Sequence, residues 1–260
     1  MILYKVIIQK YHYILNQIFE LILGLGRSCD ILQMALVDIS RKHNSWSQYM
    51  QPTQRIHSGA SRVNKLTIVN KKLCYNGVKC ENVLPPPKGI DNLVGYLQRK
   101  YPKGVVLIAH NGARFDFPLL KRDLEKNENF LKSNYDIDCV DSIKIFKKHF
   151  PALDAYNQPY LIERFLGSEN VSDAHEAVGD CENLRDALER AAQEKNLSMA
   201  EFLDIPCKKL IEDGDKGKSN KRQAKSKTPK VKRLRHVDII KERAGKKRTS
   251  RCYHLRRRSS

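Results

Sequence analysis

The sequence lacks the short patterns that mark several large enzyme classes. It has no glycine-rich phosphate loop, no dinucleotide-binding glycine pattern and no G-x-S-x-G turn. These absences exclude nucleotide switches, dinucleotide-dependent enzymes and serine hydrolases of the α/β type. Seven cysteines occur, but none forms a C-x-x-C pair and their spacing is irregular. We therefore expect neither a zinc site nor a disulfide framework, and a reducing compartment fits this cysteine usage.

Long hydrophobic runs are also missing. The first 15 residues, M-I-L-Y-K-V-I-I-Q-K-Y-H-Y-I-L, are apolar but are interrupted by Lys5, Gln9, Lys10 and His12. This stretch is too interrupted for a transmembrane helix, and it has no small-residue cleavage site. We expect no membrane segment and no membrane partner.

Acidic residues are scarce in one part of the chain. The formal net charge is +19, and residues 208–260 hold 21 Lys and Arg against 5 Asp and Glu, whereas the rest holds 27 against 24. Few apolar residues and a high charge of one sign predict a disordered tail. Such a tail can contact phosphate backbones or direct nuclear import, so we expect a nuclear or cytoplasmic protein. A tail that only aids solubility is the alternative.

Hydrophobic periodicity predicts strands alternating with helices, which is typical of an α/β layered domain. Ser58 or Ser61 is expected to cap a short helix after Ile56. Cys74–Val83 is expected to be a loop or an edge strand, and the three prolines at 85–87 a turn or polyproline connector. The expected strands are 31–39, 46–52, 105–109 and 137–140, and the expected helices are 90–100, 117–125, 142–149, 161–166, 174–195 and 199–202.

Residues 109–120 read A-H-N-G-A-R-F-D-F-P-L-L and follow an apolar strand. Asp116 stands just past the carboxyl end of this strand, where ligands bind in layered α/β folds. The alternative for Asp116 is a helix N-cap. Asn111 can hydrogen-bond a sugar or a backbone group, and Gly112 lets another backbone approach closely. Asp141, at the end of the next strand, is expected to cap the helix that follows it.

About sixty residues later the chain reads H-E-A-V-G-D, from His175 to Asp180. Five positions on a helix are about 140° past one turn, so the two side chains share a site if His175 lies in the loop before the helix. The alternative is an ordinary amphipathic helix capped by Asp173. Two aspartates and a histidine from separate elements can hold divalent cations and deprotonate a water. The pattern points to phosphodiester hydrolysis.

These two motifs resemble the second and third motifs of the DEDDh 3′–5′ exonucleases. Within that superfamily the three-prime repair exonucleases carry a similar N-G-x-x-(F/Y)-D-F-P-L-L run, and H-E-A-V-G-D matches the H-x-A-x-x-D pattern. Residues 24–33 and 56–68 also look like this family, so the resemblance spans about residues 24–195. It implies an RNase H-like exonuclease fold, with a mixed central sheet flanked by helices.

The resemblance also implies the chemistry and the partners. Two Mg²⁺ or Mn²⁺ ions would be held by Asp116 and Asp180, with His175 as the general base. The substrate would be nucleic acid, as single-stranded or 3′-ended DNA, with RNA and a homodimer left open.

The family's first motif, F-D-x-E-T-T-G-L, is not matched. This chain has F-E-L-I-L-G-L from Phe19 to Leu25. If Gly24 and Leu25 are aligned to the family's Gly-Leu, the two acid positions fall on Phe19 and Leu21, which cannot bind a metal. Glu20 is one position out of register, and strand alternation turns it to the opposite face unless a bulge intervenes. Glu20 is the remaining candidate metal ligand.

The sequence thus favours a metal-dependent 3′–5′ exonuclease. The alternative is a catalytically inactive nucleic-acid-binding protein of the same fold, because the first-motif acids are missing. We expect three parts: a divergent N-terminal segment (1–23), an exonuclease domain (24–205) and a disordered basic tail (206–260).

Overall fold

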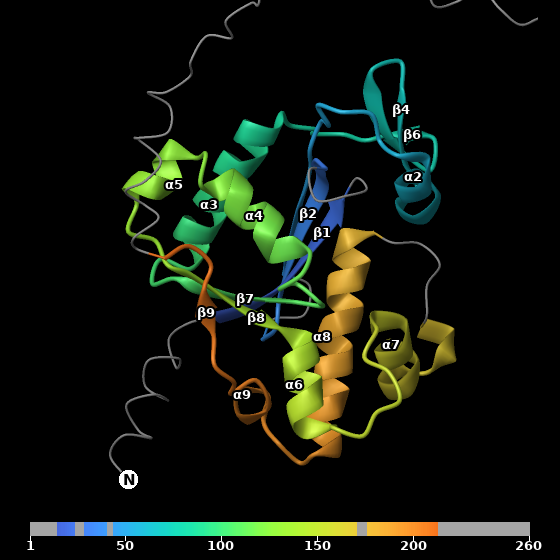
Figure 1. Cartoon of the computed structure of the whole chain (residues 1–260), viewed down its shortest axis with the longest axis vertical. Helices are drawn as coiled ribbons and strands as arrows, with labels where there is room; N and C mark the ends of the chain where they lie inside the picture. The colour runs from blue at the N-terminus through green and yellow to red at the C-terminus, as the bar shows by residue number, and fades with distance from the viewer. Residues whose placement is uncertain (1–14, 24–28, 41–43, 171–175, 213–260) are drawn as a thin grey trace, which may run out of the picture. The chain divides into compact units, whose positions relative to one another are not determined.

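The computed structural model describes residues 15–23, 29–40, 44–170 and 176–212. By its contacts the chain divides into residues 1–219 and 220–260, and all of the described residues lie in the first unit. There a six-stranded mixed sheet carries helices on both faces (Figure 1), which confirms the predicted fold class. None of the described helices is long and apolar enough to cross a membrane.

The central sheet has the strand order β3-β2-β1-β7-β8-β9. Its middle is parallel, with β1 beside β7 and β7 beside β8, and the remaining pairs are antiparallel. All residues of β2 and β7 are buried, because both faces of the sheet are covered, and such strands are largely apolar. The bounds are β1 Leu15–Leu23, β2 Ile31–Asp38, β3 Ser45–Tyr49, β7 Val105–Ala109, β8 Ile137–Asp141 and β9 Lys208–Lys209.

Strand β1 occupies the centre of this sheet, although its residues belong to the segment that the sequence set apart as divergent. It pairs with β2 from Gln17 to Leu23 and with β7 from Leu15 to Ile18. A register shift between Ile22 and Leu23 marks an irregularity in the ladder with β2. The predicted domain boundaries remain a prediction.

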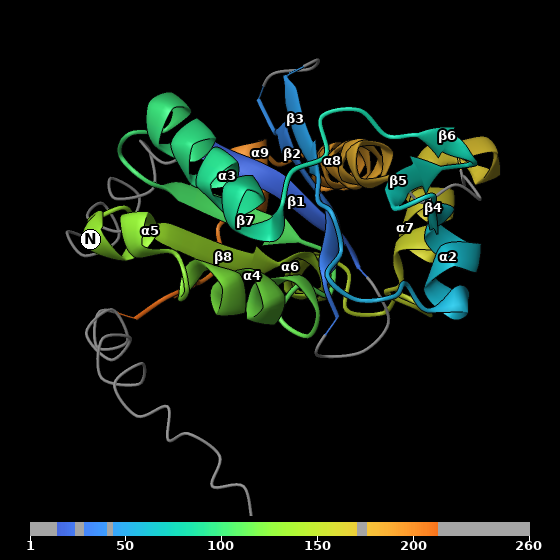
Figure 2. The ribbon, with the colours of Figure 1, turned by 90° about the horizontal axis from the view of Figure 1, so that it is seen from above.

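Two groups of helices cover the two faces of the sheet (Figure 2). One face packs on α3, α4 and α5, in a core that includes Phe19, Leu21 and Leu107. The other face packs on α6, α7, α8 and α9, in a core that includes Ile18 and Ala35. The bounds are α3 Pro86–Lys100, α4 Asp116–Leu124, α5 Glu128–Lys132, α6 Ser142–His149, α7 Gln158–Leu166, the 3-10 helix η1 Ser168–Asn170, α8 Ala177–Glu194 and α9 Met199–Phe202.

A small antiparallel sheet and a short helix form a separate layer beside α8. Helix α2 (Ser58–Asn64) leads into β4 (Leu66–Val69), β5 (Lys72–Tyr75) and β6 (Val78–Lys79). Asn76 and Gly77 join β5 to β6 with positive φ of 49° and 79°, the conformation that two-residue hairpin turns require. The sequence predicted only a loop or one edge strand here.

Two local predictions were wrong. The cap of α2 is His57, whose Nδ1 accepts a hydrogen bond from the Gly59 N–H at 3.0 Å, and not Ser58 or Ser61. The three prolines do not form a connector: Pro85 is the N-cap of α3, and the other two fill its first turn. Proline is tolerated there because the first helical N–H groups have no partner within the helix.

Candidate active site

Asp116 is the first residue of α4, and its carboxylate is directed at the central strand. It is 3% exposed, and its Oδ1 accepts a hydrogen bond from the backbone N–H of Leu21 at 3.0 Å. The N-cap of α4 is Phe115, without a side-chain cap hydrogen bond. The N-cap alternative for Asp116 is therefore wrong, because the carboxylate reaches across to β1 instead of closing its own helix.

Burial raises the pKa of Asp116 from its usual 3.8 to about 7. Desolvation is the main cause, and the nearby Asp141 carboxylate raises the pKa further, whereas the N–H groups of Leu21 and Asp116 lower it. A buried carboxyl group of this kind favours a bound cation, because the cation would offset the free-energy cost of desolvating the carboxylate.

This pKa shift predicts a pH-dependent stability. The folded state keeps a proton on Asp116 that the unfolded chain releases near pH 4, so the free energy of unfolding should fall as pH rises from about 4 to about 7, by on the order of a few kcal/mol. Asp116→Asn should remove this dependence. Urea unfolding at pH 5 and pH 8 without divalent cations checks it, and equal pH slopes for the two proteins would contradict it.

The loop between β7 and α4 is fixed by Asp141, which sits at the end of β8. Its carboxylate accepts hydrogen bonds from the N–H groups of Asn111 at 3.1 Å and Ala113 at 3.2 Å. It also accepts from Ile143 at 3.0 Å, which confirms the predicted cap of α6. The sequence missed the loop contacts, because they join positions about thirty residues apart.

Asn111 adopts a left-handed conformation with φ of 55°, and its side chain is half-buried. A substrate-binding role for Asn111 stays a prediction. Gly112 allows close approach of side chains and not of backbone: a Cβ there would lie 2.6 Å from Ala109 Cβ and 2.8 Å from the Phe117 ring. The loop is thus packed tightly against the start of α4.

Asp180 lies in the first turn of α8, on the other face of the sheet from α4. Its backbone carbonyl accepts a hydrogen bond from Gln158 Nε2 at 3.0 Å. The next residue, Cys181, donates weakly through its Sγ to the carbonyls of Ile18 at 3.7 Å and Ala35 at 3.8 Å. Asp180 is therefore held beside β1 and β2, whereas Asp116 contacts β1 from the other face of the sheet.

The start of α8 also contacts β2 through Gln33. The Ala177 N–H donates to Gln33 Oε1 at 3.4 Å, and Gln33 Nε2 is buried without a hydrogen-bond partner among the described residues. Helix α8 begins at Ala177 with Glu176 as N-cap, so Asp173 is not the cap. His175 lies outside the described residues, and its role stays a prediction.

The positions that the resemblance assigns to the first-motif acids hold buried apolar side chains. Phe19 is 0% exposed and Leu21 is 4% exposed, both in the core under α3 and α4. The backbone of Glu20 pairs with Ala35 of β2, but its side chain lies outside the described part of the structure. Among the described residues, no group of three His, Cys, Asp or Glu side chains is arranged to hold a metal ion.

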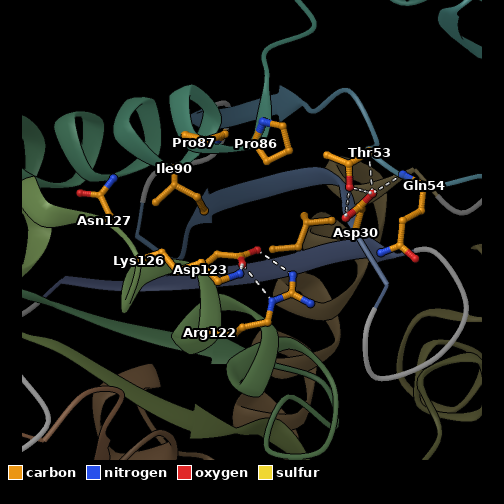
Figure 3. Close-up of a pocket in the computed structure, with 11 residues that line it drawn as sticks. Asp30, Thr53, Gln54, Pro86, Pro87, Ile90, Arg122, Asp123, Lys126 and Asn127 are labelled. Carbon is orange, nitrogen blue, oxygen red and sulfur yellow. Dashed lines mark hydrogen bonds and ion pairs between the residues drawn. The ribbon is translucent and has the colours of Figure 1, made fainter. Parts of the chain in front are cut away.

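A cavity of about 650 Å³ lies at the opposite end of α4 from Asp116 (Figure 3). Its charged groups are already paired: Asp30 accepts from Thr53 and Gln54, and Arg122 bridges Asp123 at 2.7 Å. Asp116 and Asp180 are not among its lining residues. We therefore place the candidate chemistry at Asp116 and not in this cavity.

Comparison with known proteins identifies one family. Residues 80–188 match the exonuclease family RNase_T, and this range includes both Asp116 and Asp180. The chain is 28% identical over 158 residues to the DNA polymerase III subunit epsilon of Buchnera aphidicola, covering 59% of this chain. The match spans 58% of that relative's own length.

Two solved structures are similar in fold. One is Exonuclease X in complex with 5′ overhanging duplex DNA, at 18% identity and a TM-score of 0.48, covering 72% of this chain and 98% of that one. The other is Exonuclease I from Methylocaldum szegediense, at 14% identity and a TM-score of 0.53, covering 73% of this chain and 42% of that one. The likeness in fold rests on the second. Residues 80–188 are thus similar to an exonuclease family, and the fold of the described residues is similar to that of an Exonuclease I.

Proposed function

We propose that this chain is a divalent-metal-dependent exonuclease that removes nucleotides from the 3′ end of DNA. The observation that carries the proposal is the Asp116 carboxylate, buried at the start of α4 and hydrogen-bonded to the N–H of Leu21. A desolvated acid with a raised pKa, in a domain of an exonuclease family, has the chemistry that a catalytic metal ion needs.

Two Mg²⁺ or Mn²⁺ ions would be the cofactor if the site is intact, with Asp116 and Asp180 as the described carboxylates that would hold them. Mg²⁺ keeps several waters and is held by one or two carboxylates together with substrate phosphates. Asp116 and Asp180 would supply the carboxylates. When bound, the ions would polarise the scissile phosphodiester and stabilise the charge that develops there. Glu20 would be the additional ligand in the first strand.

Other residues of the chain would activate the attacking water and bind the substrate. His175, just before α8, would accept the proton of the attacking water, and Asn111 would bind the sugar of the terminal nucleotide. Asp141 would position the loop that carries Asn111, because it accepts hydrogen bonds from the N–H groups of Asn111 and Ala113. The basic stretch 208–260 supports a nuclear location and contact with phosphate backbones.

A second candidate function is nucleic-acid binding without hydrolysis. It is favoured by Phe19 and Leu21, whose buried side chains leave the first-motif positions without oxygen ligands. Binding through a basic surface does not need these ligands. The two candidate functions differ in whether the bound DNA is hydrolysed when a divalent metal ion is added.

Digestion of 5′-labelled single-stranded DNA with Mg²⁺ or Mn²⁺ tests the proposal, with Asp180→Ala as the matched variant. We expect a ladder that shortens from the 3′ end and is lost in the variant and in chelator. DNA that is bound but stays intact with folded protein would establish the second function and overturn the first. Cleavage that persists in the variant would exclude Asp180 from the site.

A further inference from the structure

The segment that forms helix α2 and strands β4–β6 has the largest local excess of positive charge before residue 208. From Arg55 to Cys80 the sequence has six Lys and Arg and no Asp or Glu, whereas residues 1–207 hold 27 basic residues against 24 acidic ones. The excess of positive charge before the basic tail is therefore concentrated in this short layer. We call the surface of this layer the basic hairpin surface; its basic members are the exposed Arg55, Arg62, Lys71, Lys72 and Lys79 and the half-buried Lys65.

Little of this charge is neutralised within the protein. Of the six basic side chains, only Lys79 forms an ion pair with a described residue, Glu81 at 3.2 Å, and that pair is exposed. Lys65 donates to the backbone carbonyl of Arg62 at 3.0 Å. Several basic side chains without ion-pair partners on one surface create an electrostatic field that attracts polyanions.

The same surface exposes large aliphatic side chains. Val63 is 53% exposed, Val69 is 49% exposed and Val78 is 71% exposed, and Ile68 lies among them at 39%. Among the described residues, the one other large hydrophobic side chain with comparable exposure is Phe115, in the loop before Asp116. Exposed apolar side chains concentrated in one short layer mark an interaction site.

A cavity of about 630 Å³ opens in this surface between α2 and β4. Arg55 and Lys71 contribute the charge, and Ser58, Ser61 and Thr67 contribute hydroxyl groups. Guanidinium, ammonium and hydroxyl donors beside aliphatic side chains match a sugar–phosphate backbone, whose phosphates accept hydrogen bonds and whose sugars are partly apolar.

The layer is packed beside the candidate active site. Leu66 and Leu73 belong to the same buried core as Ala177 and Cys181 at the start of α8. Tyr75 of β5 has a raised pKa, mainly through burial and also through the carboxylates of Glu176 and Asp180. Figure 1 and Figure 2 both place β4–β6 beside the beginning of α8. A DNA strand whose 3′ end lies at Asp180 can therefore continue over α2 and β4–β6.

We propose that the basic hairpin surface holds the sugar–phosphate backbone of the DNA strand whose 3′ end enters the candidate active site. The proposal rests on the proposed function for the identity of the polymer, and it adds where the strand lies. An anionic lipid surface is the other polyanion that basic and aliphatic side chains attract. The hydroxyl-lined cavity between α2 and β4 favours the nucleic acid, because its serine, threonine and basic side chains would hold discrete phosphates.

The test is binding of the full chain to fluorescein-labelled oligo-dT of about 20 nucleotides in chelator, so that hydrolysis does not enter. Lys71→Glu/Lys72→Glu reverses two exposed charges of the surface. The matched control is Lys88→Glu/Lys132→Glu, which changes the net charge equally but lies on α3 and α5, at exposed positions on the other face of the sheet.

We expect the hairpin variant to bind roughly tenfold more weakly and to flatten the slope of log affinity against log salt by about 1.4, because each phosphate contact to single-stranded DNA contributes about 0.7. The control should change the slope by less than half of this. Equal effects of the two variants would overturn the proposal, since binding would then follow net charge alone. If Lys71→Glu/Lys72→Glu does not fold, Lys71→Ala/Lys72→Ala takes its place with the same expectation.

Binding of both variants to vesicles that contain phosphatidylserine tests the lipid alternative. If the hairpin variant loses vesicle binding but keeps its DNA affinity, the surface is a membrane contact and the proposal is wrong. A hairpin-dependent DNA affinity in a protein that cleaves no DNA would support this inference and refute the proposed hydrolysis, so the two failures are distinguishable.

Discussion

Asp116→Asn is expected to lower the rate of DNA hydrolysis at saturating substrate by at least about a hundredfold, because several kcal/mol of charge stabilisation depend on a carboxylate that holds the metal ion. The fold should persist, since an asparagine oxygen can still accept the hydrogen bond from the Leu21 N–H. The variant should also be more stable than the parent protein at pH 8, because a buried charge is removed. Loss of activity together with a gain in stability is the signature of a functional residue.

Asp123→Asn is the control for this experiment. Asp123 lies on the same helix and pairs with Arg122 and Lys126, so its loss should lower stability without removing activity. Full activity of Asp116→Asn in single-turnover digestion would exclude Asp116 from the site. The gain in stability is measured by urea unfolding and does not depend on whether the parent protein is active.

Restoring the family's first motif with Phe19→Asp/Leu21→Glu is expected to unfold the protein rather than activate it. Phe19 is 0% exposed and lies among apolar side chains of β2, α3 and α4. Removing a buried phenylalanine costs about 3–5 kcal/mol, and burying an unpaired carboxylate adds to this cost. The sum is comparable to the whole stability of a typical domain, about 5–15 kcal/mol.

The conservative variant Phe19→Leu should cost only about 1–2 kcal/mol and leave the circular dichroism spectrum unchanged. A double variant that folds and cleaves DNA faster would contradict the structure at this strand. It would mean that positions 19 and 21 face a metal site and not the apolar core under α3 and α4.

The sequence predicted the elements with strong periodicity and missed those defined by pairing. Strands β2, β7 and β8 and helix α8 follow from hydrophobic spacing, since each buries a continuous apolar face. The β4–β6 sheet was missed because its strands have two to four residues each, too few to show alternation. The Asn76-Gly77 pair was the available signal, as this dipeptide favours a tight hairpin turn.

The candidate site was predicted unevenly for a similar reason. The residue type and position of Asp116 indicated a ligand just past a strand end; the structure places Asp116 as the first residue of α4, buried against β1, and its role as a ligand stays a prediction. Its hydrogen bond to Leu21 and the anchoring of the Asn111 loop by Asp141 could not be predicted, because each depends on which strands become neighbours. The order in which β1, β7 and β8 lie side by side is a property of the whole sheet, and no local pattern encodes it.

The hydrogen bond between Leu21 and Asp116 also ties the site to the order of folding. It closes a loop of 95 residues, and β1 can enter the sheet beside β7 only after the intervening residues are in place. Contacts of such long range form late, because the entropy of closing the loop must be overcome before they form. A chain synthesised as far as Asp116 already contains β1, but Asp116 gains its hydrogen bond from Leu21 only when β1 and β7 have become neighbours in the sheet.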